Sequence, residues 1–111
     1  PWGYTPLESI AFGIPTITTD LSGFGQWINS RKEQGLEKSG VKVLHRGDLN
    51  FVEVSEDLAD SILALSHCGK AQRAKIGQAA TNVSLEAEWK HFIEYYKQAF
   101  HLALKKAALR K

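Results

Sequence analysis

Apolar positions along the chain follow two patterns, which together predict alternating helices and strands. The runs at residues 14–19 and 41–44 are short and β-branched, as in strands. Helices are expected from apolar steps of three and four at residues 26–29, 55–68, 71–82 and beyond residue 84. This alternation favours a parallel α/β sheet, but two strands are too few for a stable sheet of their own. We therefore expect the last portion of a larger doubly wound domain.

The segment beyond Ser84 predicts a long final helix with one broad apolar face. Its apolar residues recur at helical spacing, at Trp89, Phe92, Ile93, Tyr96, Phe100, Ala103 and Leu104. The opposite face is charged, with Glu88, Lys90, Glu94 and Lys97. A stripe of this width is typical of a helix that packs against another surface.

The first helix is expected to begin with a capping box. Thr5 has the side chain of an N-cap residue, Pro6 suits the first helical position, and Glu8 stands three residues after Thr5. This helix would run to Phe12 and end at Gly13. Elsewhere, a glycine-bearing turn is expected at residues 20–25, a charged loop at residues 31–38, and a helix cap at Ser55.

The start of the first helix is the strongest candidate binding site in the sequence. In open α/β sheets, ligands bind at the carboxyl ends of strands, where helix N-termini present free N–H groups to phosphates. Gly3 would let a ligand approach the backbone closely, and the amides of Tyr4, Thr5 and Leu7 would be free donors. Glu8 has two open roles, as a capping residue or as an acceptor for the vicinal hydroxyls of a ribose. On the local pattern alone, a capped helix without a ligand is the more common case.

Longer motifs add to this candidate. Residues 1–8 read Pro-Trp-Gly-Tyr-Thr-Pro-Leu-Glu, residues 13–19 read Gly-Ile-Pro-Thr-Ile-Thr-Thr, and residues 22–25 read Ser-Gly-Phe-Gly. This order resembles the donor-site segment of the glycogen synthase family of fungi and animals. A second stretch is similar to the same family's terminal helix, with Trp89, Lys90, Tyr95, Tyr96, Lys97, Ala103 and Leu104. The resemblance thus touches both ends of the chain and leaves residues 30–80 unmatched.

The resemblance implies a retaining transfer of glucose from a nucleotide diphosphate sugar to the 4-hydroxyl of a growing α-1,4-glucan. UDP-glucose or ADP-glucose would be the donor, and no cofactor or obligatory metal is expected. Carried over to this sequence, Trp2 and Gly3 lie beside the donor glucose. Tyr4 and Thr5 face the diphosphate through their backbone, and Glu8 lies at the nucleotide ribose.

The resemblance also implies a fold class. Residues 1–111 would be the C-terminal part of the Rossmann-like donor-binding domain of a GT-B glycosyltransferase, a three-layer α/β/α structure with few parallel strands. Residues 85–111, the terminal helix, would cross back to an N-terminal domain outside these residues. The family's first glutamate would stand just before Pro1, so no catalytic residue is expected within the chain, and the isolated chain should be inactive. A homo-oligomer is left open, since the apolar stripe would favour self-association.

Composition and charge bear on the partners, metal sites and compartment to be expected for this protein. The net charge of +2 reflects a cluster of cations at the end of the last helix, with no acid after Glu94, so no nucleic-acid partner is expected. The single cysteine, Cys68, suits a reducing compartment such as the cytoplasm. The histidines lack the spacing of a zinc site, and no apolar run approaches the roughly 20 residues that span a bilayer. We therefore expect a cytoplasmic protein with no metal site and no membrane partner.

Two alternatives stay open. A related GT-B transferase would share the diphosphate site and use another donor or acceptor. A non-catalytic α/β interaction module would bind no nucleotide and would dock a partner helix on residues 89–104. A glutamate immediately before Pro1 would favour transfer chemistry over the module.

Overall fold

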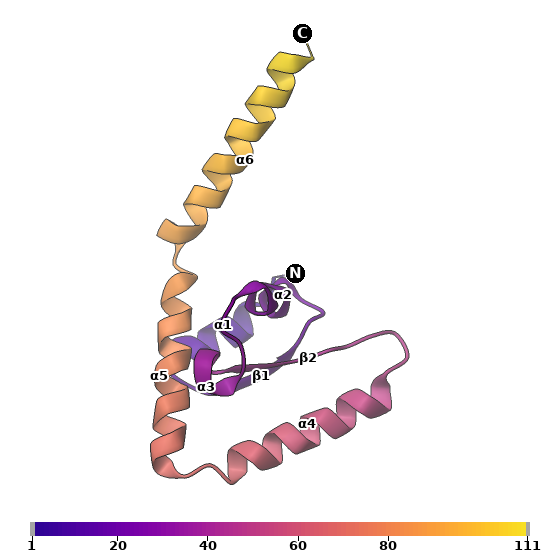
Figure 1. The fold of residues 1–111 in the computed structure, drawn as a ribbon, viewed down its shortest axis with the longest axis vertical. Helices are drawn as coiled ribbons and strands as arrows, with labels where there is room; N and C mark the ends of the chain where they lie inside the picture. The colour runs from indigo at the N-terminus through magenta and orange to yellow at the C-terminus, as the bar shows by residue number, and fades with distance from the viewer. Residues whose placement is uncertain (1, 111) are drawn as a thin grey trace.

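A computed structural model of the chain describes residues 2–110, with the backbone alone at residues 89–92. The elements in chain order are α1 (Tyr4–Ala11), β1 (Thr16–Thr19), α2 (Gly23–Ser30), α3 (Leu36–Ser39), β2 (Val41–Leu44), α4 (Phe51–Ser66), α5 (Lys70–Glu86) and α6 (Trp89–Leu109). Helices surround a small sheet in the lower part of Figure 1, and α6 leads away from it. The α/β class predicted from the sequence is confirmed.

The two predicted strands pair in parallel, and this places their carboxyl ends at one edge. Thr16 lies opposite Val41 and Thr19 lies opposite Leu44. Residues 20–40, which carry α2 and α3, form the long crossover that a parallel pair requires. The first strand begins at Thr16, whose N–H donates to the Gly40 carbonyl at 2.9 Å. Proline has no N–H for such a ladder, which explains why Pro15 stays outside β1.

The hydrophobic core lies between α1, α2, β2 and α5. Its buried side chains are Ile10, Phe24, Ile28, Val41, Ala80 and Val83. Trp2, Leu7, Trp27 and Val43 pack against this cluster and are partly buried. Each large apolar side chain taken out of water stabilises the fold by about 1.5–3 kcal/mol, so this cluster fixes the positions of α1 and α2 on the sheet.

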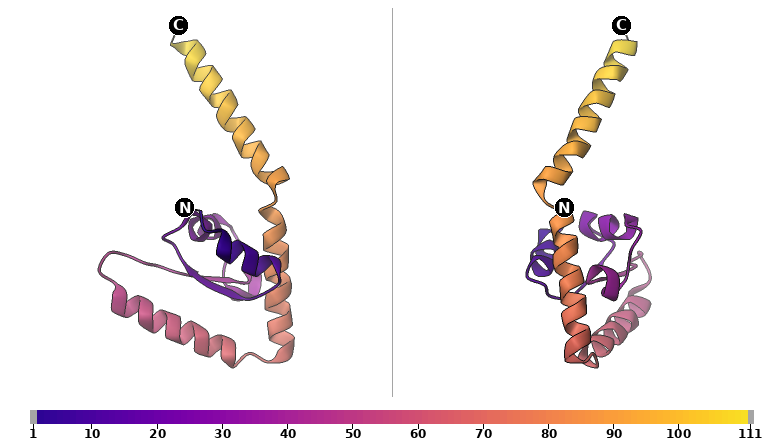
Figure 2. Two further views of the ribbon diagram at one scale, coloured as in Figure 1. Left: turned by 180° about the vertical axis from the view of Figure 1, so that it is seen from behind. Right: turned by 60° about the vertical axis from the view of Figure 1, so that its left-hand side comes forward.

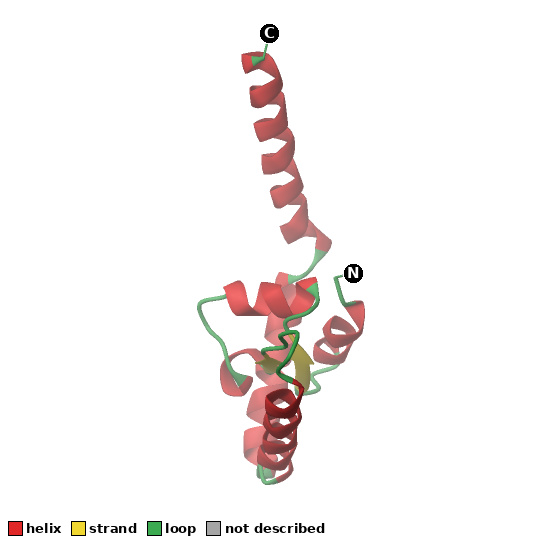
Figure 3. Ribbon diagram, turned by 90° about the vertical axis from the view of Figure 1, so that its right-hand side faces the viewer, coloured by secondary structure: helices red, strands yellow, loops and turns green. Residues whose placement is uncertain are grey.

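The last helix is long, as predicted, but the described residues leave its apolar face uncovered. Figures 2 and 3 show α6 projecting away from the rest of the chain in every view. Its exposed apolar side chains are Tyr95, Tyr96, Phe100, Leu102, Leu104 and Leu109. The side chains of Trp89 and Phe92, which belong to the predicted stripe, lie outside the described residues. No helix in the described part of the chain has the length and apolar content that a membrane crossing demands.

Two predicted connections contain helix. The first helical turn of α2 begins at Gly23, inside the turn expected at residues 20–25. The short helix α3 forms within and just after the loop expected at residues 31–38. Gly35 and Gly40 bracket α3 with positive φ angles of 94° and 73°, which glycine adopts without steric cost. The charged residues of this segment predicted a loop, and they gave no indication of the short helix that Gly35 and Gly40 bound.

Two helix starts also differ from expectation. The fourth helix begins at Phe51, so Ser55 lies inside it, and its hydroxyl donates to the Phe51 carbonyl at 2.9 Å. The last helix begins at Trp89, because the extended backbone of Glu88 interrupts the helical path after α5. In each case a serine that favours a helix cap, Ser55 or Ser84, lies inside a helix instead.

Candidate functional site

The starts of α1 and α2 meet at the carboxyl edge of the sheet. The first helix precedes β1 through a tight turn, so its N-terminus lies near the end of that strand, and α2 follows the same strand after residues 20–22. The Phe24 N–H, in the first turn of α2, donates to the Trp2 carbonyl at 2.6 Å. Figure 1 shows α1 beside α2. Two helix N-termini therefore converge at the edge where open α/β sheets bind ligands.

The helix cap of α1 is Gly3, which corrects the capping box predicted from the sequence. Gly3 has φ 93° and ψ 70°, and no side chain caps the helix. Thr5 lies inside the first turn and is exposed, and the Glu8 carboxylate makes no hydrogen bond among the described residues. The helix ends as predicted, because Gly13 has φ 72° and its N–H donates to the Ile10 carbonyl at 2.9 Å.

The contact between the two helix starts has no room for further atoms. A Cβ at Gly3 would lie 2.8 Å from Ser22 Oγ, and the positive φ angle of Gly3 already disfavours a side chain. A Cβ at Gly23 would lie 2.6 Å from Trp2 Cδ1. Two glycines therefore let the Trp2–Gly3 backbone lie directly against the start of α2. Any shift of α2 toward α1 would displace Trp2 and Gly3.

An aromatic cluster holds the same contact from the inside. The Trp2 ring centroid lies 5.6 Å from that of Tyr4, 5.6 Å from that of Phe24 and 5.9 Å from that of Trp27. The Trp2–Phe24 pair is edge-to-face at 84°, a favoured geometry for aromatic rings. Phe24 is fully buried, whereas Tyr4 is 69% exposed. The cluster thus anchors Trp2 in the core and leaves the first residue of α1 at the surface.

The first turn of α1 offers unused backbone donors. Among the described residues, the N–H groups of Tyr4 and Thr5 have no acceptor, and Pro6 has no N–H. The helix dipole adds a partial positive charge at the same end. Glu8 lies one turn further along the same helix and is exposed. The structure therefore brings Trp2, Gly3, Tyr4, Thr5 and Glu8 together on one element, in an arrangement that suits an anion with hydroxyl groups beyond it.

A carboxylate at the same edge was missed by the sequence analysis. Asp20 follows β1 and His45 follows β2, and their Oδ2 and Nδ1 atoms lie 2.7 Å apart. The Arg46 N–H donates to Asp20 Oδ1 at 2.8 Å. This backbone hydrogen bond, followed by that of His45, lowers the pKa of the Asp20 carboxyl below its ordinary value. The position of Asp20 and His45 directly after each predicted strand was the signal that could have paired them.

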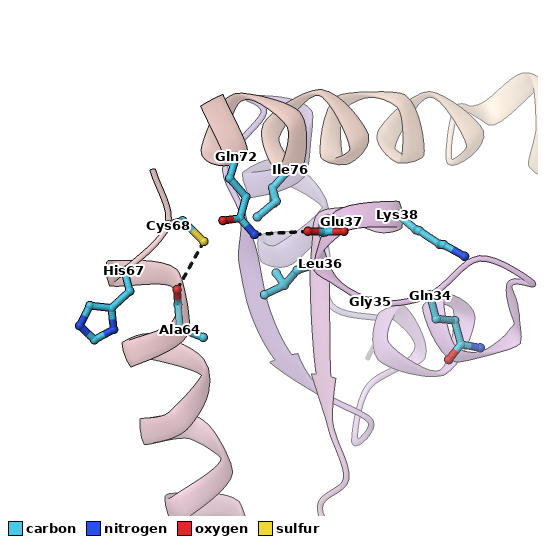
Figure 4. Close-up of a pocket in the computed structure, with 10 residues that line it drawn as sticks. All are labelled: Gln34, Gly35, Leu36, Glu37, Lys38, Ala64, His67, Cys68, Gln72 and Ile76. Carbon is cyan, nitrogen blue, oxygen red and sulfur yellow. Dashed lines mark hydrogen bonds between the residues drawn. The ribbon is translucent and has the colours of Figure 1, made fainter. Parts of the chain in front are cut away.

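A separate pocket of about 530 Å³ lies between α3, the end of α4 and the start of α5 (Figure 4). Leu36, Ala64 and Ile76 line its apolar part, and Gln72 Nε2 donates to Glu37 Oε1 at 3.3 Å across it. Cys68 also lines the pocket, and its thiol donates to the Ala64 carbonyl at 3.3 Å. None of the site residues predicted from the sequence borders this pocket. Within the described part of the chain, no group of His, Cys, Asp and Glu side chains is arranged to hold a metal ion.

Comparison with known proteins identifies the family. The family model described as glycogen synthase matches residues 1–110. The chain belongs to the glycogen synthase family. This confirms the resemblance drawn from the motifs at both ends of the sequence. It also extends the likeness across residues 30–80, which the motifs left unmatched.

Individual relatives agree with the family match. The chain is 33% identical to glycogen (starch) synthase of Caenorhabditis elegans over 108 residues, which are 96% of this chain and 16% of the relative. It is 32% identical to glycogen (starch) synthase isoform 1 of Saccharomyces cerevisiae, over 96% of this chain and 15% of the relative. The liver glycogen (starch) synthase of Mus musculus is 29% identical over the same shares. The chain thus spans about a sixth of the length of these glycogen synthase relatives.

Proposed function

We propose that the intact protein is a retaining glucosyltransferase that moves glucose from a nucleotide diphosphate glucose to the 4-hydroxyl of a growing α-1,4-glucan. Membership of the glycogen synthase family supports this proposal. The structural observation that carries it is the start of α1, where Gly3 and two N–H groups with no acceptor among the described residues lie at the carboxyl edge of the parallel sheet. UDP-glucose and ADP-glucose are the candidate donors.

The diphosphate would lie at the start of α1. Departure of a nucleoside diphosphate develops negative charge on its oxygens, and fixed N–H groups and a helix dipole stabilise such charge without reorganising. The N–H groups of Tyr4 and Thr5 supply these donors, and Gly3 permits close approach of the sugar to the backbone. Because α1 itself provides this stabilisation, we propose that transfer needs no obligatory metal or cofactor.

The nucleoside would extend along the exposed side of α1. Glu8 lies four residues after Tyr4, on the same helix face and about 6 Å further along the axis. This separation suits a ribose attached to a diphosphate at the helix start. Its carboxylate is exposed and engaged in no cap, so it is available to accept hydrogen bonds from vicinal hydroxyls. Trp2 and Gly3 would lie beside the donor glucose.

The rest of the active site would come from parts of the protein outside these residues. We propose a GT-B arrangement, in which this donor-binding portion faces an N-terminal domain that supplies the remaining sugar and phosphate contacts. The catalytic glutamate would precede Pro1, so the isolated chain would be inactive. Cys68, with no second cysteine among these residues, is consistent with a cytoplasmic location.

The test uses the intact protein and labelled glucose. Transfer to a glycogen primer is measured separately from UDP-glucose and from ADP-glucose, for the wild type, Glu8→Ala and Glu56→Ala. Glu56 is a matched control, since it is an exposed glutamate on α4 with no hydrogen bond among the described residues. Loss of charged hydrogen bonds to the ribose should reduce kcat/KM about 10- to 100-fold in Glu8→Ala and leave Glu56→Ala unchanged.

Two outcomes would contradict the proposal at different levels. A folded wild type that transfers glucose from neither donor would overturn the glucosyltransferase assignment and leave another donor, another acceptor or a binding module. An active wild type with equal activity in Glu8→Ala and Glu56→Ala would keep the function and remove Glu8 from the donor site.

A further inference from the structure

One residue, Asp20, joins three parts of the fold at the edge that carries the proposed site, through its carboxylate and its backbone. The Asp20 side chain contacts His45 Nδ1 at 2.7 Å and accepts from the Arg46 N–H at 2.8 Å. The backbone N–H of Asp20 donates to the Leu44 carbonyl at 3.1 Å, and the backbone carbonyl of Asp20 accepts from Gln26 Nε2 at 3.3 Å. Asp20 therefore ties the end of β1 to the end of β2 and to α2.

The same connection leads directly into the contact with the donor segment. Only Leu21 and Ser22 separate Asp20 from Gly23, which begins α2. From there, the Phe24 N–H holds the Trp2 carbonyl at 2.6 Å, and the Ser22 side chain lies against Gly3. Because this contact has no spare room, a change in the position of residues 20–23 would be transmitted to Trp2 and Gly3.

We propose that Asp20 is a positioning residue for the nucleotide-sugar site, acting through the start of α2 on Trp2 and Gly3. The inference rests on the proposed glucosyl transfer. The hydrogen bonds described for Asp20 join it to His45, Arg46, Leu44 and Gln26, so its proposed effect on donor binding is indirect. Its side chain is 21% exposed.

His45 and Arg46, the partners of the Asp20 side chain, are themselves held in place by hydrogen bonds. We therefore expect substitutions of Asp20 and of His45 to raise the donor KM by different amounts. Asn50 Nδ2 donates to the His45 carbonyl at 2.8 Å, and the Gly47 N–H donates to Asn50 Oδ1 at 2.7 Å. The backbone at Arg46 is therefore preformed and does not depend on the His45 imidazole, whose side chain is 80% exposed. Loss of the imidazole would leave the bond from the Arg46 N–H to Asp20 Oδ1 in place.

The experiment measures steady-state kinetics of the intact protein with the donor that supports transfer. The variants are Asp20→Ala, Asp20→Asn, His45→Ala and Asp48→Ala. Asp48 is a matched control, since it is an exposed aspartate in the same β2–α4 connection with no hydrogen bond among the described residues. Thermal unfolding of each variant separates positioning from loss of fold.

We expect Asp20→Ala to raise the KM for the nucleotide sugar about tenfold, because loss of its side-chain hydrogen bonds would let residues 20–23 shift and so misplace Trp2 and Gly3. The KM for the glucan should stay unchanged. Asp20→Asn, which keeps an acceptor for the Arg46 N–H, should rescue most of the loss and leave a rise of about two- to threefold. His45→Ala should give a similarly small rise, and Asp48→Ala none.

A purely structural role would lower the active fraction, and thus kcat, with no change in the donor KM. An unchanged donor KM in a folded, active Asp20→Ala protein would therefore overturn the inference and leave the proposed function standing. Should Asp20→Ala fail to fold, an unchanged donor KM in both Asp20→Asn and His45→Ala would overturn it equally. A folded wild type that transfers no glucose would overturn the proposed function, and this inference with it.

Discussion

The region around β1 and the last helix both contain aromatic and aliphatic side chains, which are buried in the first and exposed in the second. Around β1, Ile10, Phe24 and Ile28 are each no more than 1% exposed, and glycines bring neighbouring backbones into contact. On α6, Phe100 is 69% exposed and Leu104 is 68% exposed. Both regions contain aromatic and aliphatic residues at regular spacing. The difference lies in whether another element of the chain covers them.

This contrast shows what hydrophobic periodicity reports. A helical stripe identifies which side of a helix is apolar, and it does not say which surface covers that side. The apolar faces of α1 and α2 meet the sheet and α5 within these residues, whereas Phe100 and Leu104 on α6 stay largely exposed among them. The packed region is also the one that carries the proposed donor site, so the site can be built on contacts that these residues supply themselves.

The largest expected effect compares two phenylalanines, one from each region. Phe24→Ala removes a fully buried ring that contacts Trp2 and Trp27, so it should lower the free energy of unfolding by about 3–5 kcal/mol. Phe100→Ala removes a ring that the described residues leave exposed, so unless another part of the intact protein covers α6 it should change this free energy by less than about 0.5 kcal/mol. Urea unfolding of the intact protein, followed by tryptophan fluorescence, measures both. A Phe100→Ala loss near that of Phe24→Ala would show that another part of the protein covers α6.

A smaller effect tests how closely the packed region is fitted together. Gly40 and Gly35 both have positive φ angles, so alanine is strained at either position. A Cβ at Gly40 would also collide with the backbone and Cβ of Ala80 on α5, whereas a Cβ at Gly35 meets nothing within 4 Å. We expect Gly40→Ala to cost about 3 kcal/mol and Gly35→Ala about 1–2 kcal/mol in the same unfolding assay. Equal losses would indicate that α5 moves aside and that the packing is loose.

The sequence predicted which helices and strands form better than it predicted the residues at which they begin. Both strands, the C-terminal end of α1 and the existence of a long last helix followed from local patterns that the structure keeps. The start of α1 did not, because Thr5 and Glu8 match a capping box while the chain actually turns into the helix at Gly3. That turn is fixed by the contacts of Trp2 with Phe24 and of Gly3 with Ser22, which join segments about 20 residues apart in the chain.

The site was predictable to the same extent. The grouping of Trp2, Gly3, Tyr4, Thr5 and Glu8 at one helix start follows from their adjacency, and their roles remain predictions. The pairing of Asp20 with His45 depends on the register of β1 against β2, in which Thr19 lies opposite Leu44. No local pattern specifies that register, since either strand alone is only four residues long.

The smallest expected effect compares an ion pair from each region. Arg31 on the edge of α2 meets Glu86 at the end of α5 through two contacts, Nε to Oε2 at 2.8 Å and Nη2 to Oε1 at 3.2 Å. On α6, Lys97 Nζ lies 3.3 Å from Glu94 Oε1, and both side chains are more than 60% exposed. Two-point contacts of arginine with a carboxylate are the stronger kind. We expect Glu86→Gln to cost about 0.5–1 kcal/mol of unfolding free energy, and Glu94→Gln less than about 0.3 kcal/mol.

Salt separates the causes of these two losses. At about 1 M salt the Debye length falls to roughly 3 Å, so a loss that comes from charge attraction should shrink in unfolding assays repeated at that concentration. A Glu86→Gln loss that salt leaves unchanged would assign the stabilisation to the geometry of the two hydrogen bonds instead. A Glu94→Gln loss as large as that of Glu86→Gln would break the contrast between the regions. An exposed pair within one helix contributes so much only when a further surface shields it from water, and the described residues supply none over α6.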